Sequence, residues 1–82
     1  MRIEEISEPI GVLAACSGGQ MRPLRFRWKG RDYPVEAING RWIDRGGAGY
    51  SLHYSVQADG QTYYLHFAGP EVQWWLDKTL VE

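Results

Sequence analysis

The chain has 82 residues, 44% of them apolar, with four Trp, five Tyr and two Phe but a single cysteine. This length predicts one domain over residues 1–82, and the apolar content is enough for a core that needs neither a metal nor a disulfide framework. A formal net charge of −1 excludes a strongly basic or acidic character for the chain as a whole.

The N-terminal segment carries Glu4, Glu5 and Glu8 ahead of a short apolar run that ends at Cys16. The acidic residues have the wrong charge for a secretory signal, and the run is too short to cross a bilayer. Since the single cysteine has no partner for an internal disulfide, we expect a cytoplasmic protein that makes no membrane contact. The apolar run itself predicts a first strand near residues 9–16.

Apolar and polar residues alternate strictly on both sides of Gly30, which predicts a β-hairpin with its first strand near residues 23–29. Cross-strand aromatic, β-branched and opposite-charge pairs are each worth roughly 0.2–1 kcal/mol, and a shift by one residue would mix the two faces. The register that satisfies both faces pairs Trp28 with Tyr33, Phe26 with Val35, Leu24 with Ala37, Lys29 with Asp32, and Arg25 with Glu36.

The next strand is expected over residues 32–45, with a bend at Asn39-Gly40. Asn-Gly is also the strongest short signal for a type I′ turn, so a hairpin that pairs residues 34–38 with 41–45 is the alternative.

Two further strands, near residues 50–58 and 61–68, flank Asp59-Gly60, a dipeptide typical of a two-residue hairpin turn. The register that this turn sets pairs Ala58 with Gln61, Val56 with Tyr63, Tyr54 with Leu65, and Leu52 with Phe67 on a nearly apolar face. On the other face it pairs Gln57 with Thr62, Ser55 with Tyr64, and His53 with His66.

The last element, near residues 72–80, fits two patterns. Alternation of Val72, Trp74 and Leu76 favours a strand, whereas Pro70 at a helical first position would suit a short amphipathic helix. The strand is preferred. It places Trp74 and Trp75 on opposite faces, so at least one ring leaves the core and needs cover from the N-terminal segment or from a partner chain.

His53 and His66 are the candidate metal-binding or acid/base pair, since opposed side chains have Cβ atoms about 4.5–5.5 Å apart. A catalytic zinc takes three protein ligands, and this register supplies no third. We therefore expect neither metal nor cofactor, and two imidazoles that cover a half-solvated sheet face. With Tyr64 on the diagonal and Trp75 as the spare ring, His53, Tyr64, His66 and Trp75 are the expected interaction surface.

Basic residues concentrate in the middle of the chain, where residues 21–45 hold seven Lys and Arg against three Asp and Glu, a net of +4. Such a segment is typical of nucleic-acid contact, but its aromatic residues alternate to the opposite face and are not free to stack on bases. Nucleic-acid binding is therefore the alternative function. It would use Arg25, Arg27, Arg31 and Arg41, with Arg27 as the long cation that lacks an acidic partner.

Aromatic residues and turns recur in a characteristic order, Phe26-x-Trp28-x-Gly30-Arg31-x-Tyr33-x-Val35, then Trp42, Tyr54-x-Val56, Asp59-Gly60, Tyr63-x-Leu65 and Trp74-x-Leu76. Over nearly the whole chain this order resembles a family of small bacterial domains of unknown function. The resemblance implies a β fold and brings no established activity.

Frequent turn signals predict a mostly β fold, with about six antiparallel strands in a small bent barrel or two packed sheets and at most one short helix near a terminus. The sequence shows no nucleophile elbow, Ser/His/Asp set or paired carboxylates. We therefore expect a small non-enzymatic interaction module that binds a protein partner or a second copy of itself. A metal-dependent enzyme at the two histidines ranks third, behind nucleic-acid binding.

Overall fold

The computed structural model describes residues 1–47 and 49–81, and these residues contain no helix, and so none that could span a membrane. All strand pairings are antiparallel. The mostly β fold class is confirmed, with seven strands in place of about six. They are β1 (Arg2–Ser17), β2 (Gln20–Trp28), β3 (Arg31–Pro34), β4 (Ala37–Asp44), β5 (Ser51–Ala58), β6 (Gln61–Ala68) and β7 (Gln73–Val81).

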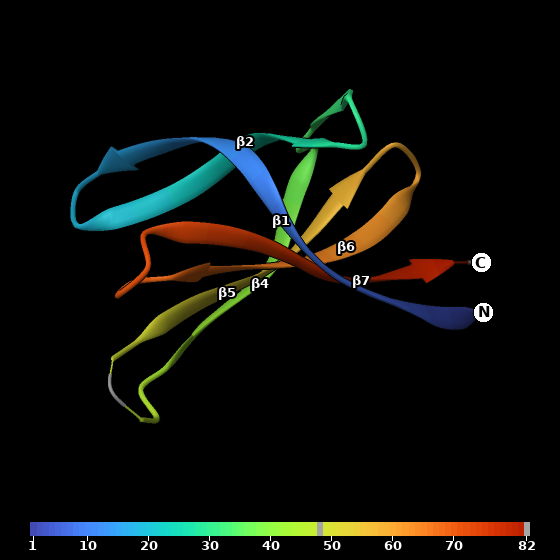
Figure 1. Cartoon of the computed structure of the whole chain (residues 1–82). Helices are drawn as coiled ribbons and strands as arrows, with labels where there is room; N and C mark the ends of the chain where they lie inside the picture. The colour runs from blue at the N-terminus through green and yellow to red at the C-terminus, as the bar shows by residue number, and fades with distance from the viewer. Residues whose placement is uncertain (48, 82) are drawn as a thin grey trace.

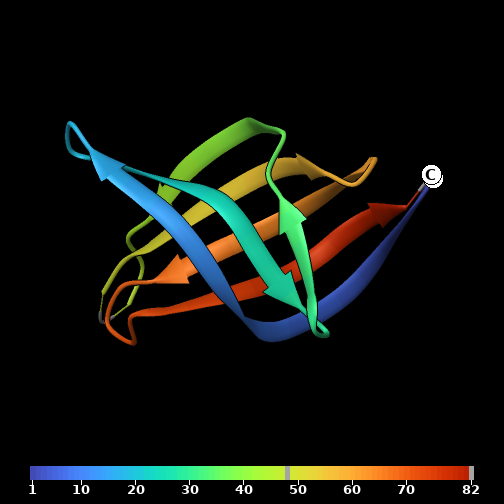
Figure 2. The same ribbon diagram turned by 90° about the horizontal axis from the view of Figure 1, so that it is seen from above.

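The strands form one sheet in the order β3-β2-β1-β7-β6-β5-β4. β1 joins its two parts, because Arg2–Ile10 pairs with β7 and Gly11–Ser17 pairs with β2. Figures 1 and 2 show that the sheet curls into a half barrel in which the start of β1 runs beside the end of β7. The two sheet edges, β3 and β4, are neighbours in sequence and flank the opening of the curl.

The inner face of the curl is the hydrophobic core. Phe26 is its aromatic centre, with its ring stacked on Tyr33 at 4.9 Å between centroids and edge-on to Tyr63 at 5.2 Å. Alternation along the strands supplies the rest, since every second residue faces inward. The largest fully buried side chains are Tyr54, Phe26, Leu65, Leu76, Val56 and Pro23.

Hydrogen bonds, rather than strand pairing, bridge the opening between β2 and the strands β4 and β5. Tyr54 donates its hydroxyl proton to the Met21 carbonyl at 2.5 Å, and Arg41 donates to the Gln20 side chain at 3.2 Å. These contacts hold the curl together, while one edge of β4 has no strand partner among residues 1–47 and 49–81.

The expected register of the first hairpin is wrong by two residues. Trp28 lies opposite Arg31 and Phe26 opposite Tyr33, so the turn is Lys29-Gly30. Both turn residues have positive φ, 53° at Lys29 and 73° at Gly30, as a type I′ turn requires. A slip of two residues keeps every side chain on its expected face, which is why the alternation could not reveal it.

The expected single strand over residues 32–45 is wrong, because this segment divides into β3 and β4 at opposite edges of the sheet. Ala37 pairs with Gln57 of β5, so the expected pair of Leu24 with Ala37 is also absent. A β-bulge between β1 and β2 sets Leu13 opposite Arg25 and Ala14 opposite Pro23, so that Leu24 has no partner in β1. Pro23 is consequently buried, and Leu24 is 43% exposed.

The two open alternatives are settled in favour of strands. The Asn39-Gly40 dipeptide is an irregularity inside β4 rather than a hairpin turn, because residues 37–44 pair along β5 on both sides of it. Residues 73–81 form a strand rather than a helix. The N-terminal strand begins earlier than expected, at Arg2, because pairing with the end of β7 extends it.

Candidate functional site

A row of four aromatic side chains crosses the outer face of the sheet. The rings of Trp42, His53, His66 and Trp75 come from β4, β5, β6 and β7, and each is close to parallel with the next. The centroid distances are 5.5, 5.2 and 6.4 Å, and the interplanar angles are 9°, 25° and 11°. We call these four residues the ring row.

Two of the four members come from the second hairpin, whose predicted register is confirmed at every pair. Asp59 and Gly60 have φ values of 50° and 75°, the backbone of a two-residue type I′ turn. This turn fixes His53 directly opposite His66. Cross-strand neighbours on one face stand about 5 Å apart, and the imidazoles stack at that spacing.

The outer two members are placed by pairings between segments distant in sequence. Trp75 lies opposite His66, and Trp42 lies opposite His53. Trp75 is partly buried, and on its other side it has Pro9 of β1 opposite it, so the N-terminal strand flanks this tryptophan within the chain. Trp42 stands on the sheet edge and remains 47% exposed.

Asp77 adds a carboxylate to the row. It is the extra residue of a β-bulge in β7, between Leu76 opposite Leu65 and Lys78 opposite Tyr64. Its two carboxylate oxygens lie 2.7 and 3.0 Å from Nδ1 of His66, and both side chains are partly buried. A carboxylate at this distance accepts a hydrogen bond that Nδ1–H donates, which fixes the ring orientation.

The side chain of His53 is held by a contact within its own strand. Its Nε2 lies 2.9 Å from the Ser51 hydroxyl. Partial burial, and then the charge that His66 gains on protonation, hold the pKa of His53 below its usual value, while Asp77 and Asp44 act in the opposite direction. His53 therefore favours its neutral form.

Tyr64 shares the outer face but does not belong to the row. It lies opposite Ser55, and the Lys78 ammonium sits 5.1 Å from its ring centroid. The expected interaction surface of His53, Tyr64, His66 and Trp75 thus occupies one face of β5, β6 and β7.

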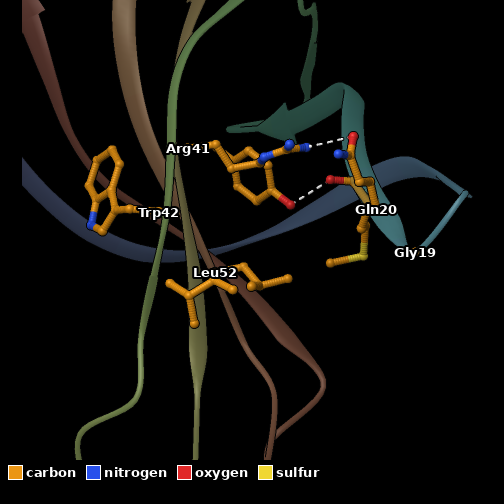
Figure 3. Close-up of a pocket in the computed structure, with 8 residues that line it drawn as sticks. Gly19, Gln20, Arg41, Trp42 and Leu52 are labelled. Carbon is orange, nitrogen blue, oxygen red and sulfur yellow. Dashed lines mark hydrogen bonds between the residues drawn. The ribbon is translucent and has the colours of Figure 1, made fainter.

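A cavity of about 260 Å³ lies on the other side of β4. Figure 3 shows Arg41 reaching from β4 toward Gln20, while the indole of Trp42 lies on the opposite side of β4 from Gln20. The cavity fills the opening of the curl between the start of β2 and the strands β4 and β5, and it takes no lining from the two histidines. Its lining is Gly19, Gln20, Met21, Arg41, Trp42, Ile43, Leu52 and Tyr54.

The four candidate nucleic-acid contacts do not form one free surface. Arg27 makes two hydrogen bonds to Asp32, at 2.8 and 3.2 Å, so the expectation that it lacks an acidic partner is wrong. Arg31 pairs with Asp59 at 2.8 Å, which ties the two hairpins together. Arg41 donates to Gln20, and Arg25 alone of the four has no side-chain hydrogen bond to another described residue.

Sequence reasoning missed Trp42 and Asp77 as members of this site. The alternation of side chains along the last strand does place Asp77 on the same face as Trp75, since residues two apart in a strand share a face. The pairing of β6 with β7 and of β4 with β5 was the missing information, because no short turn signal sets either register.

Comparisons with known proteins identify a family. Searches of curated proteins and of solved structures each found no match. A family model described as Domain of unknown function (DUF6504) matches residues 1–79. Because this match spans nearly the whole chain, the chain belongs to the DUF6504 family of domains of unknown function.

Proposed function

We propose that this domain is a non-enzymatic interaction module that binds a protein chain along the free edge of β4. The partner that the fold itself offers is a second copy, since an unpaired edge strand is complementary to itself in antiparallel orientation.

The observation that carries this proposal is the apolar exposure of β4. Trp42 is 47% exposed and Ile43 is 50% exposed, and they are adjacent residues of a strand with a partner on one side only. A free edge supplies main-chain hydrogen bonds to an added strand, and a large aromatic side chain beside it supplies contact area.

Trp42 also indicates how a second copy would fit. An antiparallel pair of β4 strands centred on this residue sets Trp42 against Trp42, because residues directly opposite each other share a face. The ring row of one copy would then continue into that of the other. Burial of two half-exposed indoles favours this arrangement over one centred on a polar residue.

The geometry of the row favours a protein partner over nucleobases. Because the rings are close to parallel, each inner ring has its faces occupied by its neighbours. A platform for single-stranded nucleic acid needs open ring faces beside a continuous cationic groove. Three of the four candidate arginines are engaged with other side chains. Nucleic-acid binding therefore has less support.

We infer a reducing, cytoplasmic setting in a bacterium for this module. The support is the single cysteine, Cys16, which is exposed and free, as is usual for a protein of a reducing compartment. We also take the spacing from Phe26 to Val35 as a mark of the family, because both its aromatic rings and its glycine have structural roles in the first hairpin.

Sedimentation velocity tests the proposal over protein concentrations from about 1 μM to about 1 mM. We expect a reversible dimer that Ile43→Lys abolishes, since an edge lysine blocks strand addition. Leu13→Lys is the matched control, because Leu13 is likewise about half exposed, at 54%, but lies on β1 and not on the β4 edge. A wild type that stays monomeric throughout, or a control that dissociates the dimer equally, contradicts the proposal.

A further inference from the structure

The outer face of the sheet brings together two imidazoles and one carboxylate that no single segment of the sequence contains. His53, His66 and Asp77 come from three adjacent strands, and each is partly buried. We propose that these three residues form a binding site for a divalent transition-metal ion of the zinc class. The inference does not depend on the proposed docking role of β4.

The distances suit such an ion. Each residue offers one ligand atom, and these three atoms all lie within 4.8 Å of one another. Metal-to-ligand distances of about 2.0–2.2 Å place the ligand atoms of a tetrahedral zinc site roughly 3.3 Å apart. The largest of these separations must therefore close by at most about 1.5 Å when the ion binds, through adjustment of the three side chains.

The donor set selects the class of ion. Two imidazole nitrogens and one carboxylate oxygen suit Zn²⁺ and its neighbours Co²⁺ and Ni²⁺, whereas Mg²⁺ and Ca²⁺ prefer oxygen ligands throughout. Three protein ligands leave the fourth tetrahedral position to water or to a side chain of a partner.

Neighbouring side chains restrict the rotation of the two histidine ligands, as outer-shell residues do in metal sites. Trp42 packs against the outer side of the His53 ring, and Trp75 packs against the outer side of the His66 ring. The Ser51 hydroxyl fixes the tilt of His53 through Nε2. Because two stacked indoles and a hydroxyl limit the rotation of both imidazoles, less conformational entropy is lost on metal binding.

The hydrogen bond between His66 and Asp77 accounts for part of the cluster without a metal, and this alternative predicts different behaviour. The hydrogen bond needs Asp77 and His66 only, and it gives His53 no role beyond covering the sheet. A metal site needs all three side chains at once. Removal of His53 therefore separates the two accounts.

Calorimetric titration of the chelator-treated protein with Zn²⁺ tests the proposal. The background carries Cys16→Ser, because the exposed Cys16 thiol is itself a zinc ligand. We expect one ion per chain with micromolar affinity, quenching of tryptophan fluorescence when Co²⁺ or Ni²⁺ replaces Zn²⁺, and no heat from Mg²⁺. His53→Gln, His66→Gln and Asp77→Asn should each weaken the affinity at least tenfold.

Asp44→Asn is the matched control, since this carboxylate lies on β4 near His53 but outside the cluster. Its zinc affinity should equal that of the background protein. Circular dichroism and a melting curve in chelator establish that each variant is folded before titration. The proposal is overturned if Zn²⁺ shows no saturable binding below about 100 μM, or if any of the three ligand variants binds as tightly as the background.

Discussion

The two hairpins of this domain differ in how well their sequences specify their registers. Asp59-Gly60 set the pairing of β5 with β6 correctly at every position, whereas the same reasoning placed the turn of the β2–β3 hairpin one residue too far along the chain. Yet the two turns are alike in structure. In each, a non-glycine residue with φ near 50° precedes a glycine with φ near 75°.

The difference teaches that the position of the glycine within the turn determines the register. A type I′ turn puts glycine second, and Asp-Gly makes this order obvious because Asp itself tolerates positive φ. Lysine has no comparable tolerance of positive φ, so the sequence does not indicate that Lys29 is the first turn residue, and Gly30 is predicted to be first instead of second. Charge pairing did not correct the error, because both registers set opposite charges across the ladder.

The largest expected effect comes from removing the glycine of either turn. Gly60→Val should lower the free energy of unfolding by about 1–3 kcal/mol, because a β-branched residue tolerates positive φ poorly. A Cβ at Gly60 or at Gly30 would meet no atom within 4 Å, so the cost at both positions is one of backbone conformation alone. Gly30→Val should have a smaller global effect, since β3 is a short edge strand that can detach locally.

Urea denaturation measures both variants, with Gly11→Val as the control. A Cβ at Gly11 also meets no atom within 4 Å, but this glycine has no positive φ. If Gly30→Val were as harmless as the control, the Lys29-Gly30 turn would be wrong and the two hairpins would not share a turn type.

A smaller effect is the pH dependence of the free energy of unfolding that arises from His53, on the polar face of the β5–β6 hairpin. Burial and the neighbouring His66 hold the pKa of His53 below its usual value. Below about pH 6.5 the unfolded chain therefore binds more protons than the folded one. The contribution of neutral His53 to the free energy of unfolding is fully present above about pH 6.5, and it falls as the pH drops through that value toward the folded pKa. His53→Gln should remove part of this dependence.

Thermal unfolding in chelator, at pH values between about 7.5 and 5.5, measures this difference without interference from metal ions. His66→Gln should also reduce the dependence in part, because His66 supplies one of the two causes. If the stability difference between the wild type and His53→Gln were constant over this range, the two imidazoles would not interact.

The alternation of the strands and the Asp59-Gly60 turn were enough to predict the fold class and three of the four members of the ring row, His53, His66 and Trp75. His53 and His66 are neighbours through a two-residue turn, so local chemistry determines their contact. Trp42 and Asp77 reach the row through pairings that no short turn controls, and Asp77 does so at a bulge. Bulges depend on the fit between whole strands, so alternation alone does not predict the bulge at Leu24. The alternation does place Asp77 on the face of Trp75, but only the pairing of β6 with β7 shows that Asp77 lies beside His66.

The smallest expected effect tests the corrected register of the first hairpin. The hydrogen bond from Arg27 holds the pKa of Asp32 below its usual value, so the pair stabilises the fold above the usual Asp range and loses its contribution as the pH falls through the folded pKa. Both side chains are exposed, so added salt should weaken the coupling. A double-mutant cycle of Arg27→Ala and Asp32→Ala, measured by urea denaturation at pH 7, should show favourable coupling, whereas a cycle of Arg25→Ala and Glu36→Ala should show none. If only the second cycle showed coupling, Arg25 would pair with Glu36 and the corrected register would be wrong. The two hairpins would then not share a turn type.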